Sequence, residues 1–218
     1  MSLLSDGVSV NFLPAFLAGM SINFTMAGIA LALGLALGAP LACARFHGGI
    51  AGVGAGLIVG SMRAAPTFVV MFFLLNVLPH RDTLSGVVIV AVSLVPYAAA
   101  YVADSGADAL RQFHSGSPLA CVLILPNIAR AFFVLVMSSS AGAAIGVPEG
   151  ITIILRQADK MPSTTDMLVI FAIGIACFGI PLQAGLAVIR LIQRHLSRAA
   201  LRSRTDLPVG GETSPAGS

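Results

Sequence analysis

Residues 83–103, TLSGVVIVAVSLVPYAAAYVA, form a run of 21 residues without a charged side chain. A helix needs about 20 apolar residues to cross the hydrocarbon core of a bilayer. Water is absent from that core, so a helix, which bonds its own backbone groups, is the form that such a run adopts there. The run therefore predicts a transmembrane helix.

The composition of the whole chain agrees with a membrane protein. Of its 218 residues, 57% are hydrophobic and only 10% are charged, whereas soluble domains have about 25% charged residues. The mean hydropathy is +0.95. These values exclude an ordinary soluble enzyme and a disordered chain, and three cysteines are too few for a disulfide scaffold. We therefore expect an all-α, polytopic membrane protein.

Other uncharged runs mark further spans, because each charge near the bilayer centre costs about 2.5–3.5 kcal/mol. Residues 18–44 predict a first span, preceded by a short interfacial segment, and residues 167–189 predict the last one. Residues 46–79 and 115–148 are each 34 residues long, too long for one span and too short for two. In each we expect one span and one helix at the inner surface. Five spans result, with six as the alternative.

Arginines set the expected orientation. Five of them, at positions 190, 194, 198, 202 and 204, follow the last span, and segments rich in Arg and Lys stay on the cytoplasmic side. We therefore expect the N-terminus outside and the C-terminus inside. Residues 1–200 are expected to form the transmembrane domain. Residues 201–218 are expected to be a disordered cytoplasmic tail, because this end is rich in Pro, Gly and Ser.

Small residues recur every four positions in two segments. On a helix, such spacing forms a flat stripe where another backbone approaches closely. Each glycine costs about 1 kcal/mol against alanine in a helix, so a packing role is expected. Packing within the monomer and packing in a subunit interface or gate both remain open. The residues are Gly48, Gly52, Gly56 and Gly60 in one segment, and Ala30, Gly34 and Gly38 in the first span.

Six polar residues within or beside the apolar runs are candidates for lining a substrate pathway. The arginines either snorkel to the membrane interface or face a polar cavity. The serines either line that cavity or pack helices, and the glutamate lies either in the pathway or in solvent. These candidates are Arg63, Arg130, Ser138, Ser139, Ser140 and Glu149.

The sequence lacks the patterns of a chemical active site. Its histidines and cysteines do not have the spacing of metal ligands. It contains neither a Gly-rich phosphate loop with a lysine nor a G-x-S-x-G motif. We therefore expect no catalytic residue, no cofactor, no metal and no nucleic acid.

Five motifs, taken in order, resemble those of the membrane permease subunits of bacterial ABC importers, in the branch that carries polar amino acids and opines. The likeness extends over about residues 14–200. The matching elements are residues 19–45 for the first span, 63–66 (RAAP) for R-G-T-P, 100–104 (AYVAD) for A-Y-x-A-E, 124–130 (ILPNIAR) for I-L-P-Q-A-x-R, and 145–149 (IGVPE) for I-G-V-x-E.

The resemblance implies a permease subunit of an ATP-driven importer in the bacterial inner membrane. It also implies partners: ATP-binding subunits inside, a second permease subunit, and a periplasmic solute-binding protein outside. In the family, a cytoplasmic E-A-A helix docks on the ATPase, and the sequence leaves no room for it between Gly116 and Ile124. A non-transporting scaffold that pairs with a complete permease is therefore the alternative.

The polar segment before Gly116 is then the expected surface for the ATPase. Asp104, Asp108 and Arg111 are spaced by four and three residues, so on a helix they share one face. We expect this face, with Gly116, to contact the ATPase more weakly than a complete loop would. A plain solvated helix end is the alternative.

Overall fold

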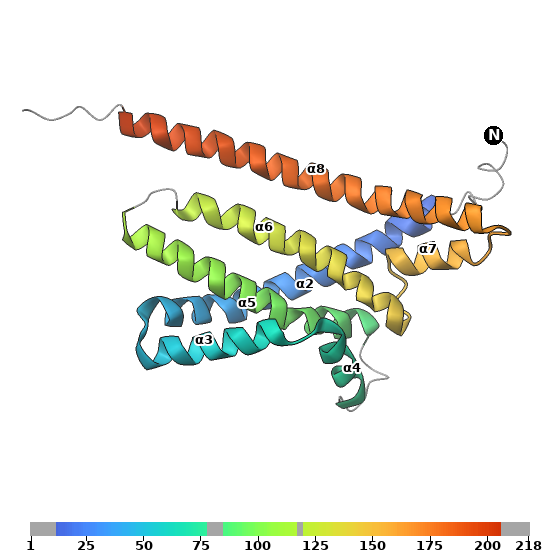
Figure 1. Ribbon diagram of the computed structural model, residues 1–218, viewed down its shortest axis with the longest axis horizontal. Coiled ribbons are helices and arrows are strands. Elements are labelled where there is room, and N and C mark those ends of the chain that lie inside the picture. Colours follow the sequence, from blue (N-terminus) through green and yellow to red (C-terminus); the bar gives the residue numbers. More distant parts are fainter. Residues whose placement is uncertain (1–11, 78–84, 117–119, 206–218) are drawn as a thin grey trace, which may run out of the picture.

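The computed structural model describes residues 12–77, 85–116 and 120–205, and these are helical almost throughout (Figure 1). The predicted all-α fold is confirmed. In chain order the elements are α2 (Phe12–His47), α3 (Gly49–Ala64), α4 (Thr67–Val77), α5 (Gly86–His114), α6 (Ala120–Ser138), the 3-10 helix η1 (Ser139–Ile145), α7 (Gly150–Ala158) and α8 (Thr164–Thr205).

The prediction of about five spans is confirmed for the described part of the chain. Four helical segments there are long and apolar enough to cross a membrane: α2, α5, α6 with η1, and α8. The pair α3 and α4 is a fifth apolar segment, bent by 89° between its halves, and has the form of either a broken span or a re-entrant loop. The bend lies at Ala65, whose backbone is extended, because the residue before a proline disfavours helical geometry and Pro66 follows it.

The expectation of one span plus one helix at the inner surface is wrong for residues 115–148 and stays a prediction for residues 46–79. Residues 46–79 contain two helices, α3 and α4, which are separated by a break at Ala65 and Pro66. In residues 115–148 no separate surface helix precedes the span, because α6 runs unbroken from Ala120 to Ser138 with Pro126 inside it. Neighbouring groups in a bundle satisfy the backbone that a proline leaves free.

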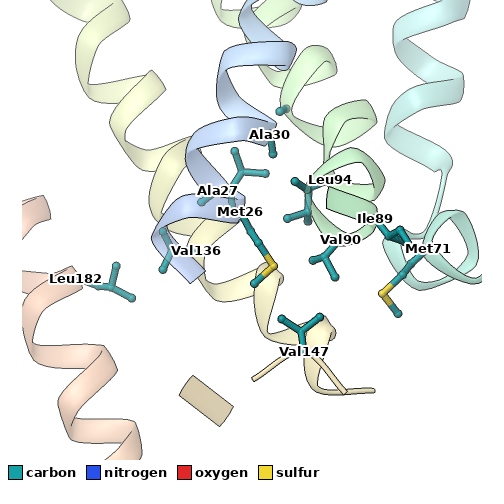
Figure 2. Packing of buried hydrophobic residues seen from close by; sticks show 13 residues of the cluster. Met26, Ala27, Ala30, Met71, Ile89, Val90, Leu94, Val136, Val147 and Leu182 are labelled. Atoms are coloured by element: carbon teal, nitrogen blue, oxygen red, sulfur yellow. The ribbon is translucent and has the colours of Figure 1, made fainter. Parts of the chain in front are cut away.

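Helix α5 lies at the centre of the bundle and packs against α2, α3, α4 and α6. In its most apolar stretch 61% of the residues are buried, against 17% for α8 at the periphery. Figure 2 shows the main core, where Met26 and Ala30 of α2 lie between Leu94 of α5 and Val136 of α6. The α2–α5 contact is close because Gly34 and Gly38 meet the α5 backbone directly, as expected for a small-residue stripe.

The C-terminal ends of α2, α5 and α8 lie at the same end of the molecule (Figure 1). Arg45 and Arg111 lie in the last turns of α2 and α5, and Arg190 lies in the C-terminal half of α8. We call this the basic end. Elements η1 and α7 lie at the opposite end. Helix α8 continues to Thr205, so positions 201–205, expected in the disordered tail, are helical. The expectations for residues 1–11 and 206–218 lie outside the described residues.

The second glycine stripe packs within the chain only in part, at Gly52. Gly48 lies outside the helices with a φ of 72°, in the turn between α2 and α3, where glycine is tolerated because it lacks a Cβ. A Cβ at Gly52 would lie 3.3 Å from the carbonyl oxygen of Ala44. At Gly56 and Gly60 a Cβ would meet nothing within 4 Å. A subunit interface or gate remains the prediction for these two.

The substitution Gly56→Leu tests whether the open glycines of α3 face another subunit or face lipid. Because the position is open, we expect the stability of the isolated chain to change by no more than about 0.5 kcal/mol, while association with a second permease chain is lost. Thermal unfolding in detergent and co-purification of the pair measure the two effects. Gly54→Leu is the control, because a Cβ there also meets nothing within 4 Å and the position lies about 160° around the helix from Gly56. Retained association in Gly56→Leu would show that the stripe faces lipid.

Candidate functional site

Three charged side chains from three helices meet in the half of the bundle nearer the basic end. Arg45 near the end of α2 donates through Nη1 to Oδ1 of Asp104 on α5. Arg63 in the last turn of α3 contacts the other carboxylate oxygen, Oδ2. The side chains of Arg45 and Asp104 are 25% and 26% exposed, whereas that of Arg63 is 62% exposed. Two arginines share one carboxylate, so the cluster carries a net charge of +1.

This ion cluster joins residues that were assigned to different roles. Arg63 was a candidate for the pathway and Asp104 for the ATPase contact, and the structure places them in contact. Asp104 is bound by Arg45 and Arg63, whereas Asp108 and Arg111, on the same face of α5, bind each other. The contact of Asp104 with the ATPase stays a prediction. Arg45 was not among the candidates, since an arginine at a helix end is ordinary in a membrane protein.

The rest of the expected ATPase surface is exposed. Arg111 donates through Nη1 to Oδ1 of Asp108 at 3.0 Å, and both side chains are more than half exposed. Gly116 ends this segment with a φ of 81°. An exposed pair of this kind contributes little to stability, about 0–1 kcal/mol. It is therefore available to a partner.

A second polar cluster lies at the opposite end of the molecule and centres on Glu149. This residue is fully buried and caps the N-terminus of α7. Its Oε2 accepts from the backbone N–H of Ile151 at 2.9 Å, and its Oε1 from that of Thr152 at 2.8 Å. The positive end of a helix dipole favours a carboxylate at this position. The interpretation of Glu149 as a solvated residue is therefore wrong.

Asn23 of α2 completes this cluster. Its Nδ2 donates to Oε2 of Glu149 at 3.0 Å and to Oγ of Ser139 at 2.9 Å. Its Oδ1 accepts from the backbone N–H of Gly150 at 3.0 Å. With every group of the Asn23 amide bonded, the cluster joins α2, η1 and α7 as a structural unit. Its signal in the sequence is a lone asparagine inside the apolar run of residues 18–44, and Asn23 was not among the predicted site residues.

The three consecutive serines have different surroundings. Ser139 is buried in the cluster with Asn23 and donates to the carbonyl of Val136 at 2.7 Å. Ser140 lines a cavity of about 410 Å³ between α6, η1, α7 and α8, whose other polar side chain is Gln183. Ser138 precedes η1 without a side-chain capping bond. The cavity is lined mainly by apolar residues such as Phe171 and Phe178. Ser138 and Ser139 do not line it, so the three serines do not share this cavity.

Arg130 lies on the exposed surface of α6, and the described part of the chain gives it no ion-pair partner. Its assignment to the pathway stays a prediction. Within the described residues, no three His, Cys, Asp or Glu side chains gather as metal ligands do.

Comparison with known proteins identifies the fold. No family model and no curated protein matches the sequence. Among solved structures, one described as "Crystal structure of an amino acid ABC transporter with histidines" superposes with a TM-score of 0.66 at 20% sequence identity. The match covers 85% of this chain and 96% of that one. The chain therefore has the fold of an ABC importer permease, as its motifs predicted.

Proposed function

We propose that this chain is a permease subunit of an ATP-driven importer and forms half of its translocation pathway. The observation that supports this most strongly is the shared fold, because it extends over nearly the whole of both chains. Polar amino acids or related small solutes are the proposed substrates. The motifs at residues 63–66, 100–104 and 145–149 point to that branch, and the solved neighbour is an amino acid transporter.

The proposal includes partners and a place in the cell. The basic end would face the cytoplasm and meet ATP-binding subunits, and the opposite end would face a periplasmic solute-binding protein. A second permease subunit, identical or different, would supply the other half of the pathway. The exposed apolar side chains of α3, α4 and α8 suit contact with lipid or with that subunit. The bacterial inner membrane is the proposed location.

Co-purification and transport test this function. The full chain, purified from its native membrane, is expected to bring an ATPase subunit with it. The complex in proteoliposomes is expected to accumulate labelled L-histidine or another polar amino acid only when ATP is supplied. A chain that purifies without any ATPase under conditions that preserve its fold would contradict the proposal.

One observation favours the alternative, a non-transporting scaffold paired with a complete permease. Helix α5 ends at His114 and α6 begins at Ala120, so five residues connect them. A docking helix, like any isolated helix, needs more residues than this to form. The remaining contact would then fall on the exposed end of α5, which carries Asp108 and Arg111.

Crosslinking from that end of α5 distinguishes a working half from a scaffold. Cysteine at Gln112, which is exposed, is expected to crosslink to the ATPase subunit. Cysteine at Ala107, which is fully buried, is the control and is expected to give no crosslink. If Gln112→Cys crosslinks only to the second permease and never to the ATPase, the scaffold function is correct.

A further inference from the structure

Polar side chains follow one face of α5 from the middle of the bundle toward the basic end. Successive members are four, four and three residues apart, and residues with these spacings share a helix face. The serine is buried, whereas the two tyrosines and the aspartate are partly exposed. We call this row the α5 polar stripe. Its members are Ser93, Tyr97, Tyr101 and Asp104.

Arg63 of α3 lies over this stripe. It contacts Asp104, and Tyr101 precedes Asp104 by three residues on the same face of α5. The rings of Tyr97 and Tyr101 lie 6.3 Å apart, centroid to centroid. A guanidinium has five N–H donors in a planar fork. At 62% exposure, Arg63 retains donors that Asp104 does not occupy.

The charge of the cluster is not balanced within the described chain. Asp104 already serves both Arg45 and Arg63. The nearest acidic residue along α5, Asp108, binds Arg111, and Glu149 is buried at the opposite end. An excess positive charge beside the membrane core is costly unless an anion or water meets it. Among the described residues, the cluster therefore has one positive charge in excess.

The depth of the stripe argues for a small solute rather than a lipid headgroup. Tyr97 lies seven residues before Asp104, which is about 10 Å along a helix. It is thus further from the basic end, where headgroup phosphates would lie, and closer to the middle of the bundle. Phenols facing hydrocarbon at that depth would lack partners for their O–H groups, whereas a solute or water would provide them.

We propose that Arg63, Tyr97 and Tyr101 form a binding site for the carboxylate of a small solute. The guanidinium of Arg63 binds both carboxylate oxygens, an arrangement that the planar fork favours, and the phenol O–H groups donate to the solute. Asp104, itself held by Arg45, is a positioning residue that orients Arg63. The site rests on the proposed function in one respect: the bound solute would be the transported one.

Binding to the full chain in phosphatidylcholine nanodiscs tests the site, with L-histidine and histamine as probes. The two differ by the carboxylate alone. Because a hydrogen bond to a charged group is worth about 1.5–3 kcal/mol, the Kd for histidine should be at least about tenfold lower. Arg63→Gln is expected to abolish this preference, and Tyr97→Phe to reduce it. Arg111→Gln, another exposed arginine paired with an aspartate, should leave it intact.

Several outcomes would overturn the site without touching the proposed function. One is equal or absent binding of both probes to the wild-type chain. Another is a histidine preference that survives Arg63→Gln. A third is loss of bound phosphatidylglycerol, and not of histidine, in Arg63→Gln, which would make the cluster a lipid site. ATP-dependent uptake by the complex can persist in all three, whereas a carboxylate preference without any uptake would count against the function alone.

Discussion

Glu149→Ala is expected to lower the free energy of unfolding by about 3–5 kcal/mol, as removal of one partner from a buried charged group does. The carboxylate accepts from two backbone N–H groups at the start of α7 and from Nδ2 of Asn23. Alanine would leave these donors buried without acceptors. Because the cluster joins α2 to α7, we expect the loss to appear as early unfolding of the end that holds α7. SDS-induced unfolding of the purified chain measures it.

Two matched variants make this result specific to the buried carboxylate. Glu149→Gln keeps one acceptor oxygen but replaces the other with an NH2 group that faces N–H donors. We therefore expect an intermediate decrease in the free energy of unfolding. Ser85→Ala removes the N-cap of α5, an exposed side chain whose Oγ accepts from the backbone N–H of Val88 at 3.4 Å. The free energy of unfolding should then decrease by only about 1 kcal/mol. A Glu149→Ala chain as stable as Ser85→Ala would show that the cluster is open to water.

Gly38→Leu is expected to prevent α2 from packing against α5. A Cβ at this position would lie 2.6 Å from the carbonyl oxygen of Ala99 and 2.7 Å from Cβ of Val102. Backbone is in the way, so a rotamer change cannot relieve the overlap and the helices must separate. The cost should exceed the 1–3 kcal/mol that is typical of overpacking. Yield of monodisperse protein and the thermal midpoint in detergent report it.

Gly28→Leu is the control for that substitution, on the same helix. A Cβ at Gly28 would meet nothing within 4 Å, and replacing glycine inside a helix gains up to about 1 kcal/mol. We therefore expect this variant to be as stable as the parent chain or slightly more so. If both leucine variants lower the midpoint equally, the close α2–α5 contact is not what holds the bundle together.

The uncharged runs determined the helical class and the approximate spans. Residues 86–103 lie within α5 and residues 167–189 within α8, and both helices are long and apolar enough to cross a membrane. The uncharged runs predict this because the cost of a charge in hydrocarbon depends on local sequence alone. Motif order also predicted the permease fold. The break at Pro66 also follows from a local sequence rule, since a proline restricts the backbone of the residue before it.

The tertiary structure decided which polar side chains pair with each other. Glu149 is buried because Asn23, 126 residues earlier, lies against it, and Asp104 is bound because α2 and α3 bring Arg45 and Arg63 to it. The two glycine stripes have the same spacing, yet Gly38 packs on α5 while Gly56 is open. In a membrane protein, faces toward lipid and faces toward other helices are both apolar. The sequence therefore determines which segments are helices, whereas the packing of those helices decides which faces, and hence which polar groups, meet.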